Sequence, residues 1–273
     1  MSISTADFSF VADMVRQRSA IDLQPGKEYL VEARLTPVAL TSGVDTLGAL
    51  VGRLRRGDAK LLDAVVDALT TNETLWFRDG VPFQVFSRHL LPEVAQRSPD
   101  RRLVVWSAAC SSGQEAYSLA MLLLDWLPAN PGFGVRVVGT DISHQMVDRA
   151  RAGLYTKLEV DRGAEPYLRR YFQPVGRDWQ LRKEVRDLAS FGWGNLALPP
   201  VGVPLCDVIF LRNVLIYFDV PTKRRVIEHA RSVLRPGGFL VLGGAESVPS
   251  LGPDWKRRDL ERTVVFQNTG GTP

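Results

Sequence analysis

The sequence has 273 residues, enough to bury a large core without disulfides or metals, and this length favours two folded units over one. Apolar residues make up 45% and charged residues 23%, close to the averages of globular proteins, which excludes a disordered chain and a fibre. With 34 basic and 30 acidic side chains, the net charge is +4, too small to indicate a nucleic-acid-binding protein.

Cysteine content and hydropathy indicate the cellular compartment in which the protein is expected. The two cysteines, Cys110 and Cys206, exclude a disulfide framework and a cysteine-rich zinc site, and they suit a reducing cytosol. Asp7 and Asp13 interrupt the first apolar stretch, so it does not read as a secretory signal. No apolar run approaches the ~18 residues that a membrane span needs. We therefore expect a cytoplasmic protein with no membrane insertion and no bound metal.

The first 72 residues predict helices only. Apolar residues recur at helical spacing from Phe8 to Val15 and again over 29–40, after a break at Pro25-Gly26. Shorter helical stretches follow over 47–54 and 61–69. We expect a small helical N-terminal domain over 1–72, followed by a linker and an interdomain helix over 73–99.

From residue 100 to residue 268, strands are expected to alternate with helices. Apolar runs predict strands at 103–106, 135–140, 206–211 and 239–242, and helical periodicity covers 114–127, 143–150 and 221–234. Pro236-Gly237-Gly238 predicts a turn before the last of these strands. Such alternation indicates an α/β fold with a doubly wound parallel sheet.

The alternation lapses between residues 154 and 187, where we expect a small inserted β-subdomain. Residues 171–181 read as a hairpin around Gly176. Ten basic and five acidic side chains fall within 149–186, a surplus that suits an acidic protein surface or simply a solvated face. Residues 269–273 are expected to form a flexible tail.

The segment 108–115 is a turn of small residues between the first strand and the first helix of the α/β domain. A doubly wound sheet binds its ligand at this edge, outside the carboxyl ends of its strands. The turn lacks the G-x-G-x-x-G pattern that cradles a pyrophosphate, and Glu115 would repel phosphate and favour a cationic or hydroxyl-bearing ligand. A purely structural turn is the alternative.

Asp141 ends the second strand, where a carboxylate can accept hydrogen bonds from both hydroxyls of a ribose. The alternative is that Asp141 only caps the next helix. Residues 211–219 begin at the end of the strand expected over 206–211 and place Asn213, Tyr217 and Asp219 at the ligand edge. The turn 235–238 is of a kind frequent before the fifth strand of S-adenosylmethionine-dependent methyltransferases.

Five motifs together resemble those of the CheR-type chemotaxis receptor methyltransferases. They are 70–79 (TTNETLWFRD), 106–118 (WSAACSSGQEAYS), 139–143 (GTDIS), 212–219 (RNVLIYFD) and 235–238 (RPGG). The resemblance implies a Rossmann-like class I methyltransferase domain with an inserted small β-subdomain, preceded by a small all-α domain. It also implies methyl transfer from S-adenosylmethionine to glutamates of methyl-accepting chemotaxis receptors, which forms glutamate methyl esters and leaves S-adenosylhomocysteine.

The same resemblance assigns roles to individual positions. The residues implied to bind the cofactor are Asn72, Thr74, Arg78, Glu115, Asp141, Asn195, Leu196, Asn213 and Val214. Arg78 and Tyr217 would act at the reacting groups, with Arg78 orienting the substrate carboxylate; for Arg78 an interdomain salt bridge is the alternative. The implied partner is the cytoplasmic helical domain of chemoreceptors. The hairpin turn 173–178 is shorter than in members that bind a receptor's C-terminal pentapeptide, which counts against such tethering here.

The residues themselves agree with this chemistry. A glutamate is already ionised at neutral pH, its ordinary pKa being about 4.3, so it needs no general base to attack a methyl group. The three histidines lie outside the five motifs. Two other functions stay open at this point: a methyltransferase of another substrate, and a signalling adaptor that keeps the methyltransferase fold without catalysis.

Overall fold

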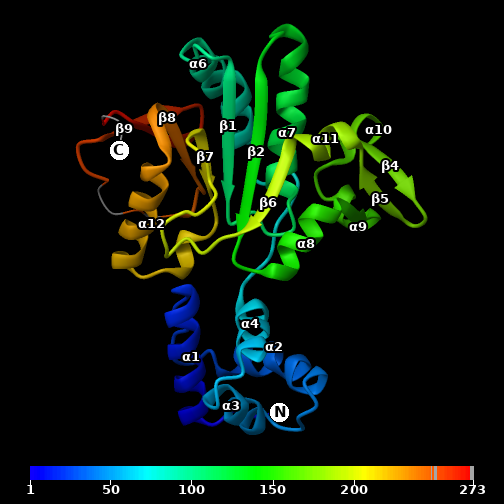
Figure 1. The fold of residues 1–273 in the computed structure, drawn as a ribbon, viewed down its shortest axis with the longest axis vertical. Helices are drawn as coiled ribbons and strands as arrows, with labels where there is room; N and C mark the ends of the chain where they lie inside the picture. The colour runs from blue at the N-terminus through cyan, green and yellow to red at the C-terminus, as the bar shows by residue number, and fades with distance from the viewer. Residues whose placement is uncertain (247, 249–250, 271–273) are drawn as a thin grey trace. The chain divides into compact units, whose positions relative to one another are not determined.

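The computed structural model describes residues 1–246, 248 and 251–270. The chain divides into two compact units (Figure 1). The first comprises Met1–Thr71 with Tyr217–Thr222, and the second comprises Asn72–Ile216 with Lys223–Pro273. Among the residues described, no helix combines the length and the apolar character needed to cross a membrane.

The N-terminal unit is helical, as the sequence predicts. Its helices are α1 (Thr5–Ser19), α2 (Glu28–Thr41), α3 (Leu47–Arg55) and α4 (Ala59–Leu69). Ser4, Thr46 and Asp58 begin α1, α3 and α4 by accepting a hydrogen bond from a backbone amide of the first turn. Apolar side chains one turn apart, such as Val31 and Leu35 of α2, point inward and are fully buried.

A seven-stranded sheet forms the second unit, with the strand order β6-β2-β1-β7-β8-β10-β9. The strands are β1 (Arg102–Ala108), β2 (Gly134–Asp141), β6 (Ala189–Trp193), β7 (Cys206–Leu211), β8 (Leu234–Leu242), β9 (Trp255–Leu260) and β10 (Thr263–Asn268). The first five in the order pair in parallel, whereas β10 runs antiparallel to both β8 and β9. The expected α/β sheet is thus confirmed, with an antiparallel edge.

Helices cover both faces of this sheet. They are α5 (Val81–Val85), the π-helical turn η1 (Phe86–Leu90), α6 (Leu91–Gln96), α7 (Gln114–Trp126), α8 (His144–Ala152), α11 (Lys183–Leu188) and α12 (Val220–Ser232), with short 3-10 turns η2 (Leu127–Ala129) and η4 (Leu215–Tyr217). Side chains alternate along β1, so Leu103 and Val105 enter the core beneath α7 while Trp106 faces the side of α12. Because helices cover both faces of the sheet, its central parallel strands are apolar on both faces.

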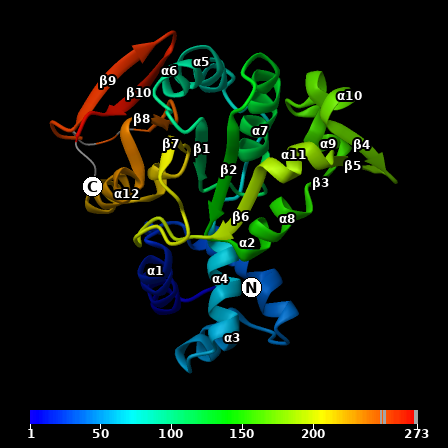
Figure 2. The same ribbon diagram turned by 45° about the horizontal axis from the view of Figure 1, so that its top comes forward.

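An inserted subdomain with its own small sheet, in the order β3-β5-β4, follows α8. It contains β3 (Leu154–Thr156), α9 (Lys157–Asp161), η3 (Glu165–Tyr167), α10 (Leu168–Tyr171), β4 (Phe172–Val175) and β5 (Asp178–Leu181). The expected hairpin forms between β4 and β5, where Gly176 takes a φ of 61°. Figure 2 shows the subdomain beyond β6, with the β9–β10 hairpin at the opposite edge of the large sheet.

Several details differ from the sequence-based expectation. Residues 235–238 belong to β8 rather than to a turn before it, because β8 begins at Leu234 and pairs with β7 through a register shift. Strands β6, β9 and β10 were not predicted. Thr269 and Gly270, placed by the sequence in a flexible tail, are hydrogen-bonded through their amides to Asp254 and Asn268, and residues 271–273 lie outside the described part.

Candidate functional site

The turn after β1 lies at the carboxyl edge of the sheet and is held in an unusual backbone conformation. Ala109 and Ser111 take φ values of 62° and 47°, in the left-handed region that only glycine enters freely. The Ser111 amide donates to Asp141 Oδ2 at 2.7 Å, and Ser111 Oγ donates to the Asn72 carbonyl at 2.8 Å. The turn therefore joins two of the predicted cofactor-binding positions.

Asp141 is 6% exposed at the end of β2. Its Oδ1 accepts a hydrogen bond from the Ser143 amide at 2.9 Å. Ser143 itself caps α8, since its hydroxyl accepts from the Met146 amide. The cap of this helix is thus Ser143, so capping does not account for the carboxylate of Asp141.

Glu115 lies in the first turn of α7 and is bonded on both oxygens. Oε1 accepts from Ser107 Oγ at 2.7 Å, and Oε2 accepts from the Arg212 guanidinium at 2.9 Å. Burial raises the pKa of this carboxyl group, while Arg212 opposes the rise by favouring the charged form. Glu115 is therefore anchored within the protein, with its carboxylate aligned by two donors.

The segment that carries Asn72, Thr74 and Arg78 belongs to this second unit. Arg78 and Thr74 are half-buried, and the Arg78 guanidinium donates to the Glu73 carbonyl at 3.1 Å. The Arg78 carbonyl accepts from Arg212 at 2.9 Å. Arg212 thus connects this segment to the start of α7 and to the end of β7.

Asn213 and Val214 follow β7 in a strained turn, since Asn213 takes a φ of 58°. A carboxylate that sequence reasoning missed, Glu246, holds this turn. Its Oε1 accepts from the Val214 and Leu215 amides at 2.9 and 2.8 Å, and its Oε2 accepts from the Gly243 amide at 2.6 Å. Glu246 therefore ties the end of β7 to the end of β8.

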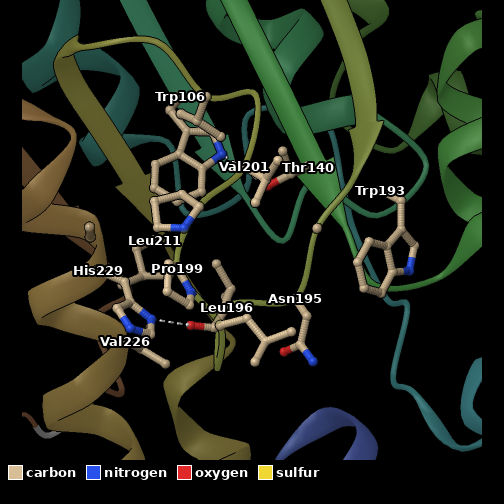
Figure 3. Close-up of a pocket in the computed structure, with 15 residues that line it drawn as sticks. Trp106, Thr140, Trp193, Asn195, Leu196, Pro199, Val201, Leu211, Val226 and His229 are labelled. Carbon is tan, nitrogen blue, oxygen red and sulfur yellow. Dashed lines mark hydrogen bonds between the residues drawn. The ribbon is translucent and has the colours of Figure 1, made fainter.

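A pocket of about 270 Å³ opens on the α12 side of the sheet (Figure 3). Asn195 and Leu196 line it together with Thr140, next to Asp141. His229 Nδ1 lies 3.1 Å from the Leu196 carbonyl, and the Gly194 amide donates to the Asp141 carbonyl. Most other lining residues are apolar: Trp106, Leu198, Pro199, Pro200, Val201, Val203, Leu211, Val226 and Ala230. An apolar pocket with a few polar groups is the usual setting of a small organic ligand.

Tyr217 is the last residue of the 3-10 turn η4 and belongs to the N-terminal unit. Its carbonyl accepts a hydrogen bond from the Asp22 amide at 3.2 Å. Its role beside the reacting groups stays a prediction. The other predicted positions lie on segments joined through Ser111, Asp141, Arg212 and Glu246.

The polar groups at this edge favour a cationic, hydroxyl-bearing ligand. Asp141 is a buried carboxylate and the Glu115 side chain is only 12% exposed, and Glu246 is close enough to raise the pKa of Glu115 further. Arg212 already pairs with Glu115 and Asp79, at 2.9 and 2.7 Å. In the part of the chain that the structure describes, no group of three or more histidine, cysteine or acidic side chains is arranged to hold a metal.

Comparison with known proteins identifies the family of this chain. Residues 6–70 match the all-alpha domain of the CheR methyltransferases, and residues 72–264 match their SAM binding domain. The chain belongs to the CheR methyltransferase family. Chemotaxis protein methyltransferase 1 of Pseudomonas aeruginosa is 40% identical, over 98% of this chain and 99% of that protein. Chemotaxis protein methyltransferase Cher2 of Pseudomonas putida is 37% identical over the same shares.

Among solved structures, a TehB-like SAM-dependent methyltransferase of Corynebacterium glutamicum is 12% identical, with a TM-score of 0.38 over 66% of this chain and 84% of that one. As a CheR methyltransferase, the protein uses S-adenosylmethionine as its cofactor. The residues fit this group, because buried carboxylates suit a sulfonium-bearing nucleoside with free ribose hydroxyls, and the small residues of the 108–115 turn admit a close backbone approach.

Sequence reasoning missed Arg212, Asp79 and Glu246, which contact the predicted positions of the candidate site. Arg212 and Asp79 stand inside two of the five motifs, so the motifs themselves marked them. Their pairing, across 133 positions of the chain, has no signal in a single sequence. Glu246 lies outside every motif, and only the fold brings it to the end of β7.

Proposed function

We propose that this protein transfers methyl groups from S-adenosylmethionine to glutamate side chains in the cytoplasmic helical domain of methyl-accepting chemotaxis receptors, forming glutamate methyl esters. The observation that carries the proposal is the nearly full-length identity of 40% to a protein named chemotaxis protein methyltransferase. The cytoplasm is the compartment we infer, because both cysteines are free and buried, as suits a reducing environment.

The cofactor supplies an electrophilic methyl group on a cationic sulfur, and the chain has to bind and align the two reactants. Asp141 would accept hydrogen bonds from the ribose hydroxyls, Asn195 and Leu196 would flank the base, and Asn213 and Val214 would line the pocket. Glu115, with Asn72 and Thr74, would face the remaining polar groups. The motif positions of the other residues support these roles, and for Asn195 and Leu196 the support is that they line the pocket.

The substrate glutamate is ionised at neutral pH, so no group of the protein has to take its proton. Opposite charges cancel as the methyl group moves, which leaves alignment as the main source of acceleration; alignment of two reactants can contribute about 7–11 kcal/mol. Arg78 would orient the attacking carboxylate, with Tyr217 beside the methyl group. The histidines have other partners: His89 faces Glu261, His144 stacks on Trp193, and His229 contacts the Leu196 carbonyl.

The test is methyl transfer from radiolabelled S-adenosylmethionine to purified cytoplasmic fragments of chemoreceptors. We expect label on the receptor that mild alkali releases as methanol, as an ester requires, and we expect calorimetric binding of S-adenosylhomocysteine. Binding without transfer would instead identify a signalling adaptor. Label that resists alkali, or that enters a different class of molecule, would identify a methyltransferase of another substrate.

A further inference from the structure

The five residues from Trp76 to Gly80 include Arg78 and have an unusual backbone. Phe77, Asp79 and Gly80 take φ values of 47°, 67° and 61°, so two side-chain-bearing residues within three positions adopt the left-handed region. Such a conformation persists only where surrounding contacts determine it. The contacts that hold this segment therefore bear on where Arg78 lies.

Arg212 holds the segment from one side. Its terminal nitrogen Nη2 donates to the Arg78 carbonyl at 2.9 Å and to Asp79 Oδ2 at 2.7 Å, and Nη1 donates to Glu115. The Arg212 side chain is 1% exposed, and its guanidinium lies over the Phe83 ring at 5.4 Å. A buried guanidinium with charged and carbonyl acceptors is fixed in orientation, because moving it would leave a buried charge without partners.

Aromatic contacts from the inserted subdomain hold the other side. The Trp76 ring meets Tyr155 and Phe172 edge to face, with centroids at 4.8 and 5.3 Å. Phe77 stacks on Tyr167 at 4.3 Å. A side chain at Gly163 would come within 2.4 Å of the Trp76 carbonyl oxygen, so the subdomain packs directly against this backbone. Rotation of the segment is thus restricted from both directions.

We propose that Arg212 and Asp79 are positioning residues, which fix the backbone of Arg78 so that its guanidinium is held ready for the substrate carboxylate. This inference rests on the proposed function, in which Arg78 orients that carboxylate. Asp79 itself is the accessible half of the pair, with 53% of its side chain exposed, and it can be replaced without leaving Arg212 unpaired because Glu115 remains.

The test compares Asp79→Gly with Asp79→Asn. Glycine tolerates the positive φ but removes the acceptor, whereas asparagine tolerates the φ and keeps an acceptor oxygen. We expect Asp79→Gly to lower kcat about 10- to 100-fold, the effect of a small misplacement of a reacting group, and to leave the affinity for S-adenosylhomocysteine within about twofold. Asp79→Asn should restore most of the turnover.

Glu261→Gly is the matched control. Glu261 also carries a carboxylate at a positive φ, 51°, and also pairs with basic side chains, Arg88 and His89, but it lies on the β9–β10 turn. We expect it to keep the kcat of the wild type. If it lowers kcat as much as Asp79→Gly does, the loss is a general effect of destabilisation and the positioning role is overturned.

Two further readouts separate positioning from mere stability. In an Arg78→Ala background, Asp79→Gly should lower kcat no further, because it acts through Arg78; an equal loss in both backgrounds would overturn the inference. Hydrogen exchange of the 76–80 amides needs no activity, and Asp79→Gly should accelerate it while Glu261→Gly should not. Unchanged exchange would overturn the inference even in a protein that methylated no receptor, whereas absent methylation with accelerated exchange would overturn only the proposed function.

Discussion

Asp141→Asn is the substitution that tests the cofactor site most directly. Both carboxylate oxygens of Asp141 accept a backbone amide, from Ser111 at 2.7 Å and from Ser143 at 2.9 Å. An asparagine presents an NH₂ group in place of one oxygen, so a donor would face a backbone donor or a ribose hydroxyl that needs an acceptor. The change therefore removes the acceptor that the ribose hydroxyls would use and strains the turn after β1.

The magnitude follows from the charge of the acceptor. A hydrogen bond to a charged group contributes about 1.5–3 kcal/mol. Because about 1.4 kcal/mol corresponds to a factor of ten, the dissociation constant for S-adenosylhomocysteine should rise about 10- to 100-fold. Isothermal titration calorimetry with the wild type and the variant measures this change.

Asp207→Asn is the control for stability. Asp207 is 7% exposed and accepts the Val104 amide at 2.8 Å, so it too is a buried carboxylate that holds a backbone amide. It lies near the start of β7, at the amino end of the parallel strands, and should keep the affinity of the wild type. An Asp141→Asn variant that unfolds at the same temperature as this control and binds S-adenosylhomocysteine within twofold of the wild type would refute the assignment of Asp141 to the ribose.

Other parts of the structure give further predictions. Arg78→Ala should abolish most methyl transfer and largely keep S-adenosylhomocysteine binding in calorimetry, and full turnover would remove Arg78 from the reaction. Burial raises the pKa of Cys206 to about 12 and that of Cys110 well above its ordinary value, so a thiol reagent at neutral pH should modify neither until the protein is unfolded in denaturant. Burial also raises the pKa of Asp207, so the folded state binds that proton more tightly than the unfolded chain, and this contribution to stability is lost as the pH rises through the folded-state pKa. Asp207→Asn does not titrate at this position, so it should lack the loss of stability that the wild type shows as the pH rises above about 4, the ordinary pKa of an aspartate. Urea unfolding of both proteins at several pH values measures this, and an unfolding free energy that depends on pH identically in the two would contradict it. Arg55 is 48% exposed beside Asp7, and reversing the charges of Arg55 and Arg56 should slow receptor methylation most at low salt if this edge of the helical unit meets an acidic receptor surface.

The strands of the large sheet that can be predicted from the sequence are the buried ones, because burial on both faces gives a continuous apolar run. Every residue of β7 is buried, so its apolar run is visible without any knowledge of its neighbours. The edge strands are different. Strand β9 (Trp255–Leu260) carries four charged residues in a row, and β6 (Ala189–Trp193) is only partly buried and holds a glycine. These segments form strands because they hydrogen-bond to the backbone of a neighbouring strand, β10 for β9 and β2 for β6. The pattern of residues within one segment does not reveal such pairing.

The connection from β6 to β7 shows the same limit. A parallel crossover usually contains a helix, but residues 194–205 form none in the described structure. Pro199, Pro200 and Pro204 remove three amide donors from twelve positions, which disfavours a helix and leaves an apolar loop. This loop lines part of the pocket beside α12. The pocket therefore depends on the absence of a helix over residues 194–205.

Two of the polar residues that the sequence did not single out, Glu246 and Arg212, hold backbone groups, and the third, Asp79, pairs with Arg212. Glu246 accepts the amides that follow β7, and Arg212 donates to the Arg78 carbonyl. Asp141, which was predicted, also holds the Ser111 amide. The proposed reaction needs no proton transfer, so it would gain little from shifted pKa values at its centre and most from segments that cannot move relative to one another. Asp141 and Arg212 would meet that need, because each is a buried charge that would be left unpaired if its segment shifted.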